Sequence, residues 1–273
     1  MRSRLRLRRL LVALLVAELL GAVVVIGLSH NRRPAESVIG DKSVRLVNLA
    51  GPSGEWLLGR VLGRMPDAIN AVEQFWGRDW SRQIVIIATD TSAEFSAQAN
   101  LDPHQDWSDI AAVSVADSVD VNARKAQGQR IVLAPGAVGM SESALGVVMT
   151  HELLHLAART DTALDAPQWL TEGVADFVAR PPAELPPEAA ANVELPNDTE
   201  LAHAGPARSA GYDRAWWFAR FIAAEYGTDG LLRLYRAACG ADHRDFAGAV
   251  VETLGTDIAT VRRGWIQWLH GTG

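Results

Sequence analysis

The chain has 273 residues, of which 48% are hydrophobic and 21% are charged, close to the averages of soluble globular proteins. This composition excludes an intrinsically disordered chain, a collagen-like repeat and a transporter with many membrane spans. The single cysteine excludes an internal disulfide framework and a cysteine-based zinc site.

Charge is distributed unevenly along the chain. Residues 1–33 hold seven arginines and one acidic residue, which leaves 19 basic and 31 acidic residues, a net charge of −12, for positions 34–273. A body this acidic repels a phosphate backbone, so we expect no binding to nucleic acid.

The first 28 residues have the pattern of an export or anchor signal. A basic segment, residues 1–9, precedes an apolar run, residues 10–28, that only Glu18 interrupts. Nineteen helical residues measure roughly 28 Å, about the thickness of the hydrocarbon core of a bilayer. Arginines before the run place the N-terminus in the cytoplasm and the rest of the chain outside. We predict a single-pass signal anchor in the cell membrane; the alternative is a cleaved signal peptide and a secreted protein.

After this signal we expect a polar linker, residues 29–42, and one α+β domain, residues 43–273. Apolar residues at helical spacing predict a helix over 55–77, which Pro66 kinks or divides. Runs rich in β-branched residues predict strands at 84–88, 112–121 and 130–134. Periodicity and capping residues predict helices at 141–159, 166–180, 212–226, 229–238 and 257–270. The strands precede most of the helices, which favours an α+β layout over alternating βαβ units, and residues 181–210 are expected to form a surface loop.

The strongest chemical signal is the run His-Glu-Leu-Leu-His at residues 151–155. Residues four apart lie on one face of a helix, so His151 and His155 can present both imidazoles to one metal ion. Glu152 stands beside the ion, where it can accept a proton from the attacking water. The flanking residues are apolar, and two buried imidazoles without a shared partner would be costly. Imidazole ligands suit Zn²⁺, which we expect as the cofactor.

A catalytic zinc ion needs a third protein ligand, for which the sequence offers two candidates. Asp161 lies six residues after His155, but no glycine turn precedes it, which favours continuation of the helix. Glu172 lies 17 residues after His155 on a second predicted helix and is the better candidate. Asp176 follows four residues later on the same face, where it can accept a hydrogen bond from a liganding histidine.

The paired motifs, His151-Glu152-x-x-His155 and Trp169-x-x-Glu172-Gly173-x-Ala175-Asp176, resemble the gluzincin zinc metallopeptidases, and among them the peptidase-MA-like domains. This resemblance implies a zincin domain with a small mixed sheet, an HExxH helix and a helical C-terminal part. It also implies that Tyr212 donates a hydrogen bond to the oxyanion. The alternative is that Tyr212 packs against Trp216 and Trp217.

These observations predict a membrane-anchored, extracytoplasmic zinc metallopeptidase that acts on peptide or protein substrates. Zinc would polarise the scissile carbonyl, and Glu152 would act as the general base. Strand 130–134 is expected to form the sheet edge along which an extended peptide lies. Two alternatives stay open: a non-catalytic, zinc-stabilised interaction domain, and a zinc hydrolase of a non-peptide amide in the cell envelope.

Overall fold

The computed structural model describes residues 35–105, 107–201 and 206–271. The chain divides into two compact units, residues 1–35 and 36–273, and the account below concerns the second. The predicted basic segment and signal anchor, residues 1–28, lie outside the described residues. Among the described helices, none is both long enough and apolar enough to cross a bilayer.

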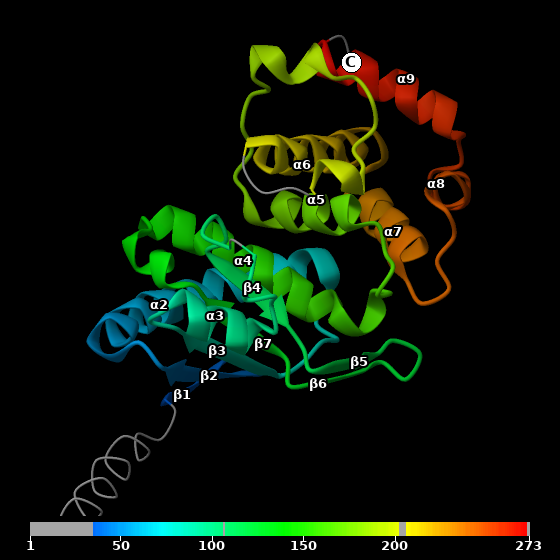
Figure 1. Cartoon of the computed structure of the whole chain (residues 1–273). Coiled ribbons are helices and arrows are strands. Elements are labelled where there is room, and N and C mark those ends of the chain that lie inside the picture. Colours follow the sequence, from blue (N-terminus) through cyan, green and yellow to red (C-terminus); the bar gives the residue numbers. More distant parts are fainter. Residues whose placement is uncertain (1–34, 106, 202–205, 272–273) are drawn as a thin grey trace, which may run out of the picture. The chain divides into compact units, whose positions relative to one another are not determined.

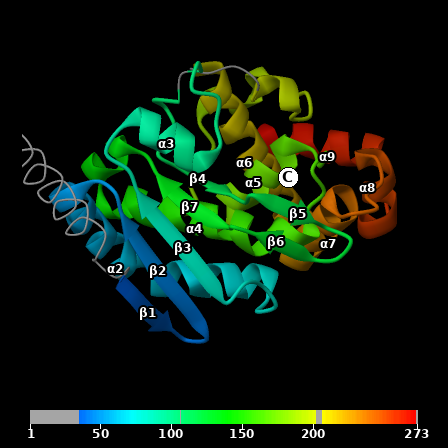
Figure 2. The same cartoon turned by 60° about the horizontal axis from the view of Figure 1, so that its bottom comes forward.

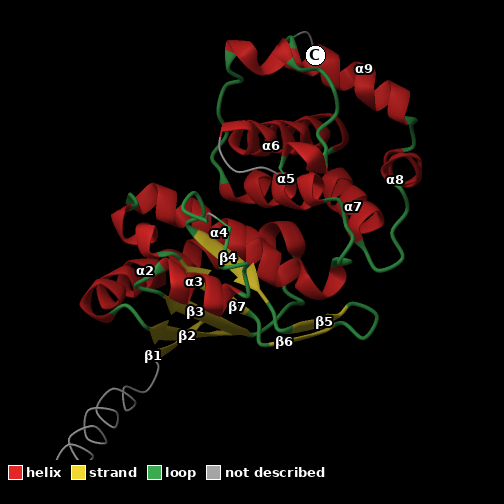
Figure 3. Ribbon diagram, viewed as in Figure 1, coloured by secondary structure: helices red, strands yellow, loops and turns green. Residues whose placement is uncertain are grey.

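The second unit combines a small mixed sheet with a mostly helical remainder, as the α+β prediction requires (Figure 3). In spatial order, the main sheet consists of β1 (Ala35–Ile39), β2 (Lys42–Asn48), β3 (Gln83–Ala88), β7 (Arg130–Leu133) and β4 (Ala112–Val115). Strands β2, β3 and β7 are parallel, whereas β4 runs antiparallel to β7 at one edge. Figure 2 shows these strands side by side. A separate hairpin contains β5 (Ser118–Asp120) and β6 (Lys125–Gln127).

The helices form two groups along the chain (Figure 1). Those packed on the sheet are α2 (Gly51–Trp76), α3 (Ser92–Ala99) and α4 (Glu142–Ala158). Those of the helical remainder are α5 (Gln168–Ala179), α6 (Pro206–Tyr226), α7 (Thr228–Cys239), α8 (Phe246–Leu254) and α9 (Ile258–Leu269). Short 3-10 turns lie at Pro135–Gly139, Arg159–Asp161, Pro187–Ala191 and Asp198–Glu200.

Helices cover both faces of the sheet, which explains the uninterrupted apolar run of β7. Ile131 and Leu133 belong to the large core that α2 and α4 share, whereas Val132, between them, packs with Phe95 of α3. Successive side chains of a strand point to opposite faces, so a strand buried on both sides has no polar alternation.

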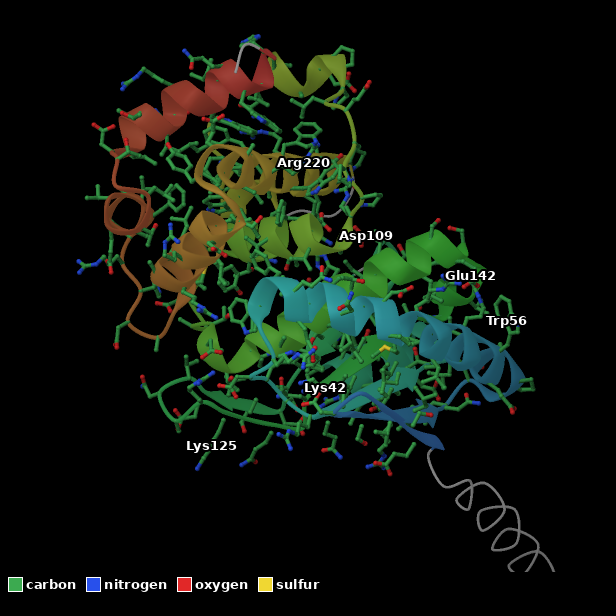
Figure 4. All side chains as sticks on the ribbon, turned by 180° about the vertical axis from the view of Figure 1, so that it is seen from behind. Lys42, Trp56, Asp109, Lys125, Glu142 and Arg220 are labelled. Atoms are coloured by element: carbon green, nitrogen blue, oxygen red, sulfur yellow. The ribbon has the colours of Figure 1, made fainter. Side chains whose placement is uncertain are left out.

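The N-terminal part of the sheet departs from the predicted layout. Strand β1 and the start of β2 occupy the second half of the segment expected as a linker, residues 29–42, so the folded part begins before residue 43. Lys42, labelled in Figure 4, is fully buried and places its ammonium 3.8 Å from the centre of the Trp80 ring. This cation–π contact holds the beginning of β2 against the segment that precedes β3.

Strand β2, ahead of α2, was not predicted as a strand, so the alternation of strands and helix in this part of the chain was missed. Helix α2 connects the parallel strands β2 and β3, which makes a βαβ unit. The helix contains Pro66 but runs unbroken from residue 51 to 76. The predicted strand 112–121 is divided between β4 and β5. Most importantly, strand 130–134 does not form the edge, because β4 pairs with its outer side.

Helix ends follow local capping signals, including two that the sequence analysis missed. Helix α4 begins as predicted, where the Ser141 hydroxyl accepts a hydrogen bond from the Ala144 amide at 3.2 Å. Helix α3 was not predicted; Thr91 caps it and Glu94 accepts from the Asp90 amide at 3.0 Å, a pattern close to a capping box. Helix α8, also not predicted, is capped by an aspartate.

An aromatic cluster stabilises the helical remainder. The Phe218 ring of α6 lies 5.4 Å from that of Trp169 in α5 and 5.5 Å from that of Trp265 in α9, both edge to face. Phe246 of α8 contacts Trp169 in the same way at 5.1 Å. Such pairs add to the stabilisation that burial itself provides, so the cluster fixes the position of α5, which carries two of the predicted site residues.

Candidate metal centre

Helix α4 presents the two histidines and Glu152 toward a cleft. The side chains of His151 and His155 are 14% and 19% exposed, and Glu152 is 8% exposed. Polar groups buried this far need partners, because an unsatisfied one costs free energy. The partners come from α5, which packs against α4.

Glu172 of α5 meets both histidines. Its Oε2 atom lies 3.1 Å from His151 Nε2 and 3.4 Å from His155 Nε2, and the two Nε2 atoms are 3.1 Å apart. These three residues form a group that could hold a metal ion. The structure therefore brings together the two predicted histidines and the preferred third candidate.

The donor atoms have the spacing that a small tetrahedral ion requires. Zinc with bonds of about 2.0–2.1 Å to nitrogen and oxygen has ligand atoms roughly 3.3–3.4 Å apart, close to the three distances in this group. His151 Nδ1 donates a hydrogen bond to Asp176 Oδ1 at 3.0 Å, which orients the ring so that Nε2 faces the other ligand atoms. The residues fit a divalent cation that prefers nitrogen and oxygen ligands.

Asp176 also belongs to a longer chain of charged groups that the sequence analysis did not predict. Its Oδ2 accepts from Arg180 Nη1 at 3.1 Å, and Arg180 Nη2 donates to Asp213 Oδ1 at 2.8 Å. The guanidinium lies over the Trp216 ring, 3.9 Å from its centre. This arrangement fixes the carboxylate behind His151. The i, i+4 spacing of Asp176 and Arg180 was the available sequence signal.

Burial and neighbouring charges shift the pKa values of these groups in different directions. Burial raises the pKa of Glu152, an effect that the two histidines and the Ser114 amide oppose. Burial would lower the pKa of His151, but its hydrogen bonds to Asp176 and Glu172 outweigh this and raise it well above the usual value. Burial opposes ionisation of Glu172, yet the adjacent histidines hold its pKa well below the usual range.

Tyr212 lies on α6 and lines the same cleft as the histidines. It occupies the second turn of the helix rather than its first residue, because α6 begins at Pro206. Burial raises the pKa of its phenol, and the negative charges of Glu172 and Glu152 raise it further. The hydroxyl therefore stays protonated and able to donate at neutral pH.

Asp161, the other candidate for the third ligand, lies outside the metal group. It ends the 3-10 turn that follows α4, and its Oδ1 pairs with Arg124 Nε at 2.8 Å. Among the described residues, the group of potential ligands contains His151, His155 and Glu172 without Asp161. A side chain already neutralised by arginine is a poor ligand for a cation.

Gly173, next to Glu172, is required by close packing of two helices. A Cβ atom at this position would lie 2.4 Å from the backbone oxygen of Ala215 in α6. Only glycine permits this approach, so the residue sets the distance between Glu172 on α5 and Tyr212 on α6.

The cleft has a volume of about 830 Å³ and passes over the metal group. Its lining includes the apolar residues Leu101, Trp107, Ile110, Val113, Val147 and Val148. It also includes polar residues outside the metal group, among them Arg159, Thr162 and Tyr235. Two charged residues of the cleft lining form an ion pair. Nη1 of Arg208, in α6, lies 3.3 Å from Oδ2 of Asp109, which is labelled in Figure 4.

Neither a model of a known protein family nor a curated protein sequence matches the chain.

Proposed function

We propose that the folded part of this chain is a zinc metallopeptidase of the gluzincin type. One observation carries the proposal: His151, His155 and Glu172 converge at the spacing of metal ligands while Glu152, buried beside them, lines the same cleft. A carboxylate in that position serves a reaction, since a purely structural ion does not need one.

His151, His155 and Glu172 would hold the zinc ion, and Asp176 would orient His151 through its Nδ1 hydrogen bond. Zinc bound there would polarise the scissile carbonyl and lower the pKa of a water molecule toward neutrality. Three protein ligands leave a position open for these reactants, as catalytic zinc sites require.

Glu152 would take the proton from the attacking water and pass it to the leaving amine. Its burial supports this role, because desolvation raises the pKa of the carboxyl toward the range in which a general base also returns its proton. The Tyr212 hydroxyl would donate to the oxyanion that develops on the carbonyl.

An extended peptide would pair with β4, the edge strand, in place of the expected strand 130–134. Ala112, Val113 and Ser114 of this strand line the cleft. Apart from Ser114, whose carbonyl and amide already face Arg159 and Glu152, the outer side of this edge strand offers backbone donors and acceptors to a substrate regardless of its side chains. This favours peptide substrates over a small non-peptide amide, and the open cleft favours catalysis over a zinc-stabilised interaction domain.

The direct test is Glu152→Gln in the metal-loaded protein, assayed on a pool of peptides with and without a chelator. We expect turnover to fall by about 10³–10⁴-fold, while metal content and the melting temperature stay near those of the parent. Glu94→Gln, far from the cleft lining, is the matched control and should keep full activity. Chelator-sensitive hydrolysis retained by Glu152→Gln would refute the mechanism.

We also propose that the N-terminal apolar run anchors this domain on the outer face of the cell membrane. The charge pattern of residues 1–28 supports the orientation. Digestion by a protease added to intact cells tests it. A mature protein in the medium that begins near residues 28–35 would instead indicate a cleaved signal peptide.

A further inference from the structure

We propose that Arg159 is a specificity-determining residue that binds a substrate carboxylate in the part of the cleft beside Ser114 of β4. This inference rests on the proposed peptidase function. It names the substrate class: peptides with an aspartate or glutamate close to the scissile bond.

Arg159 follows the metal-binding helix directly and lies on its active face. It is four residues after His155 and eight after His151, a spacing that keeps all three side chains on one side of the helix. Its Nη2 donates to the carbonyl oxygen of Ser114 and, at 3.1 Å, to the Ser114 hydroxyl. These bonds hold the guanidinium at the end of the cleft, which Arg159 lines.

Arg159 lacks the carboxylate partner that five other poorly exposed arginines have. The pairs found for those residues are Arg60–Glu142, Arg130–Asp117, Arg180–Asp176, Arg208–Asp109 and Arg214–Glu200. Arg220 also has no carboxylate partner among the described residues, but its guanidinium lies over the Trp216 ring and does not line the cleft. Within the described ranges, no acidic side chain forms an ion pair with Arg159, and its buried Nε has no hydrogen-bond partner. Burial lowers its pKa, which is the mark of a charge without close compensation.

The nearest acidic residues are committed elsewhere. Glu152 and Glu172 act on the Arg159 charge through space without contacting it, and the proposed function assigns them to the water and to the metal. A half-buried guanidinium without a counterion is costly. A carboxylate supplied by the substrate would remove this cost, and a charge-assisted bond to arginine is among the stronger hydrogen bonds.

The topology determines which end of the cleft Arg159 occupies. Strand β7 ends at Leu133, which pairs with Ala112 of the edge strand. Helix α4 begins soon afterwards, at Glu142. The beginning of α4, with Val147 and Val148, therefore lies toward the Ala112 end of β4. Arg159, at the other end of α4, reaches Ser114 further along the strand.

This geometry predicts the position of the acidic residue in the substrate. Antiparallel pairing is somewhat more stable than parallel pairing, so a peptide bound to β4 would run from Arg159 toward the part of α4 where Val147 and Val148 line the cleft. Arg159 lies about 6 Å along the helix axis from His155, which corresponds to one or two residues of extended peptide. The acidic residue then lies one or two positions before the scissile bond, and an apolar residue follows the bond.

The experiment compares kcat/KM for matched peptides in the metal-loaded enzyme and in Arg159→Met. One pair has Glu or Gln two positions before the cleaved bond, with an amidated C-terminus. The two peptides of a second pair have no acidic side chain, and one has a free C-terminus while the other is amidated. This pair shows whether a terminal carboxylate can replace the side-chain carboxylate. We expect the parent to prefer the Glu peptide by about 10–100-fold, and Arg159→Met to remove the preference.

Two further variants separate recognition from structural support of β4. Arg159→Lys keeps the charge and should retain part of the preference. Arg208→Met removes an arginine that lines the same cleft but has a partner, and it should leave the preference unchanged. Peptide hydrolysis with an unchanged Glu-to-Gln ratio in Arg159→Met would overturn this inference alone. Absence of any chelator-sensitive hydrolysis in the parent would instead refute the proposed function.

Discussion

The part built on the sheet and the helical remainder contribute different chemistry to the cleft. The first supplies both histidines and Glu152 from a single helix, α4, together with the edge strand β4. The second supplies Glu172 and Asp176 from α5 and Tyr212 from α6. Local sequence is enough to place the two histidines and Glu152, because one helix fixes their spacing. The second set reaches the histidines only when α5 packs on α4 and α6 packs on α5.

The electrostatic surroundings of the two contributions also differ. The histidine face of α4 offers lone pairs and no negative charge other than Glu152, whereas α5 brings two carboxylates backed by Arg180. A divalent ion bound there would have imidazole ligands from one part and a carboxylate ligand from the other. Variants that remove one side chain at a time test what each part contributes, and a variant that changes the packing of α5 on α6 tests whether the site depends on their positions.

The largest effect is expected from Glu172→Ala, which removes the charged donor. Metal affinity should fall by more than the 10–100-fold typical of losing an outer hydrogen-bond partner, and peptide hydrolysis should cease at the metal concentration that saturates the parent. Asp161→Ala is the matched control and should leave affinity unchanged, because Arg124 already pairs with that carboxylate. Metal analysis after dialysis measures both. The reverse pattern would assign the third ligand to Asp161.

Tyr212→Phe tests whether the helical remainder contributes to the reaction as well as to the metal. Removing one donor directed at developing charge typically costs about 10²–10³-fold in rate. The loss should fall on kcat with little change in KM, since the ground-state carbonyl carries less charge than the oxyanion. Steady-state kinetics beside a melting curve measure this. A kcat within a few-fold of the parent would show that the ring only packs in the cleft wall.

Gly173→Ala changes the docking of the helices without touching a metal donor. The added methyl would meet the Ala215 backbone oxygen at 2.4 Å, so α5 and α6 must separate. We expect about 1–3 kcal/mol of destabilisation in denaturant unfolding and a smaller loss of activity than in Tyr212→Phe. Gly59→Ala, in α2, has no neighbour within 4 Å of the new methyl and should be neutral or slightly stabilising. Equal stability of the two variants would contradict the close approach.

The sequence predicted the metal group through the spacing of individual residues. Glu172 and Asp176 lie four residues apart on α5 and therefore on one face of that helix. If Glu172 contacts a histidine of α4, Asp176 must face α4 as well. The same reasoning did not find Arg180 or Asp213, whose roles depend on the neighbouring helix. It misplaced Tyr212 at a helix start, since the first turns of α6 contain Pro206 and Gly211, residue types that are typical of loops.

The fold was predictable where one periodicity dominated and not where pairing partners mattered. Helices α4 and α5 and strands β3 and β7 followed from capping residues and apolar runs. The βαβ unit of β2, α2 and β3 did not, because parallel pairing joins residues about 40 positions apart. The edge position of β4 was not predictable for the same reason, because the residues of a strand do not determine which strands lie on either side of it.

By itself, the sequence determined the constellation of histidines and Glu152, because an α-helix converts a spacing of four residues into a shared face. It also determined that Glu172 and Asp176 form a pair on the next helix. Only the tertiary structure decided that Glu172 rather than Asp161 joins the histidines, that β4 is the open edge, and that Arg159 has no carboxylate partner. These outcomes depend on contacts between segments that are far apart in the sequence. Such contacts are set by how the core packs, and no local sequence pattern contains them.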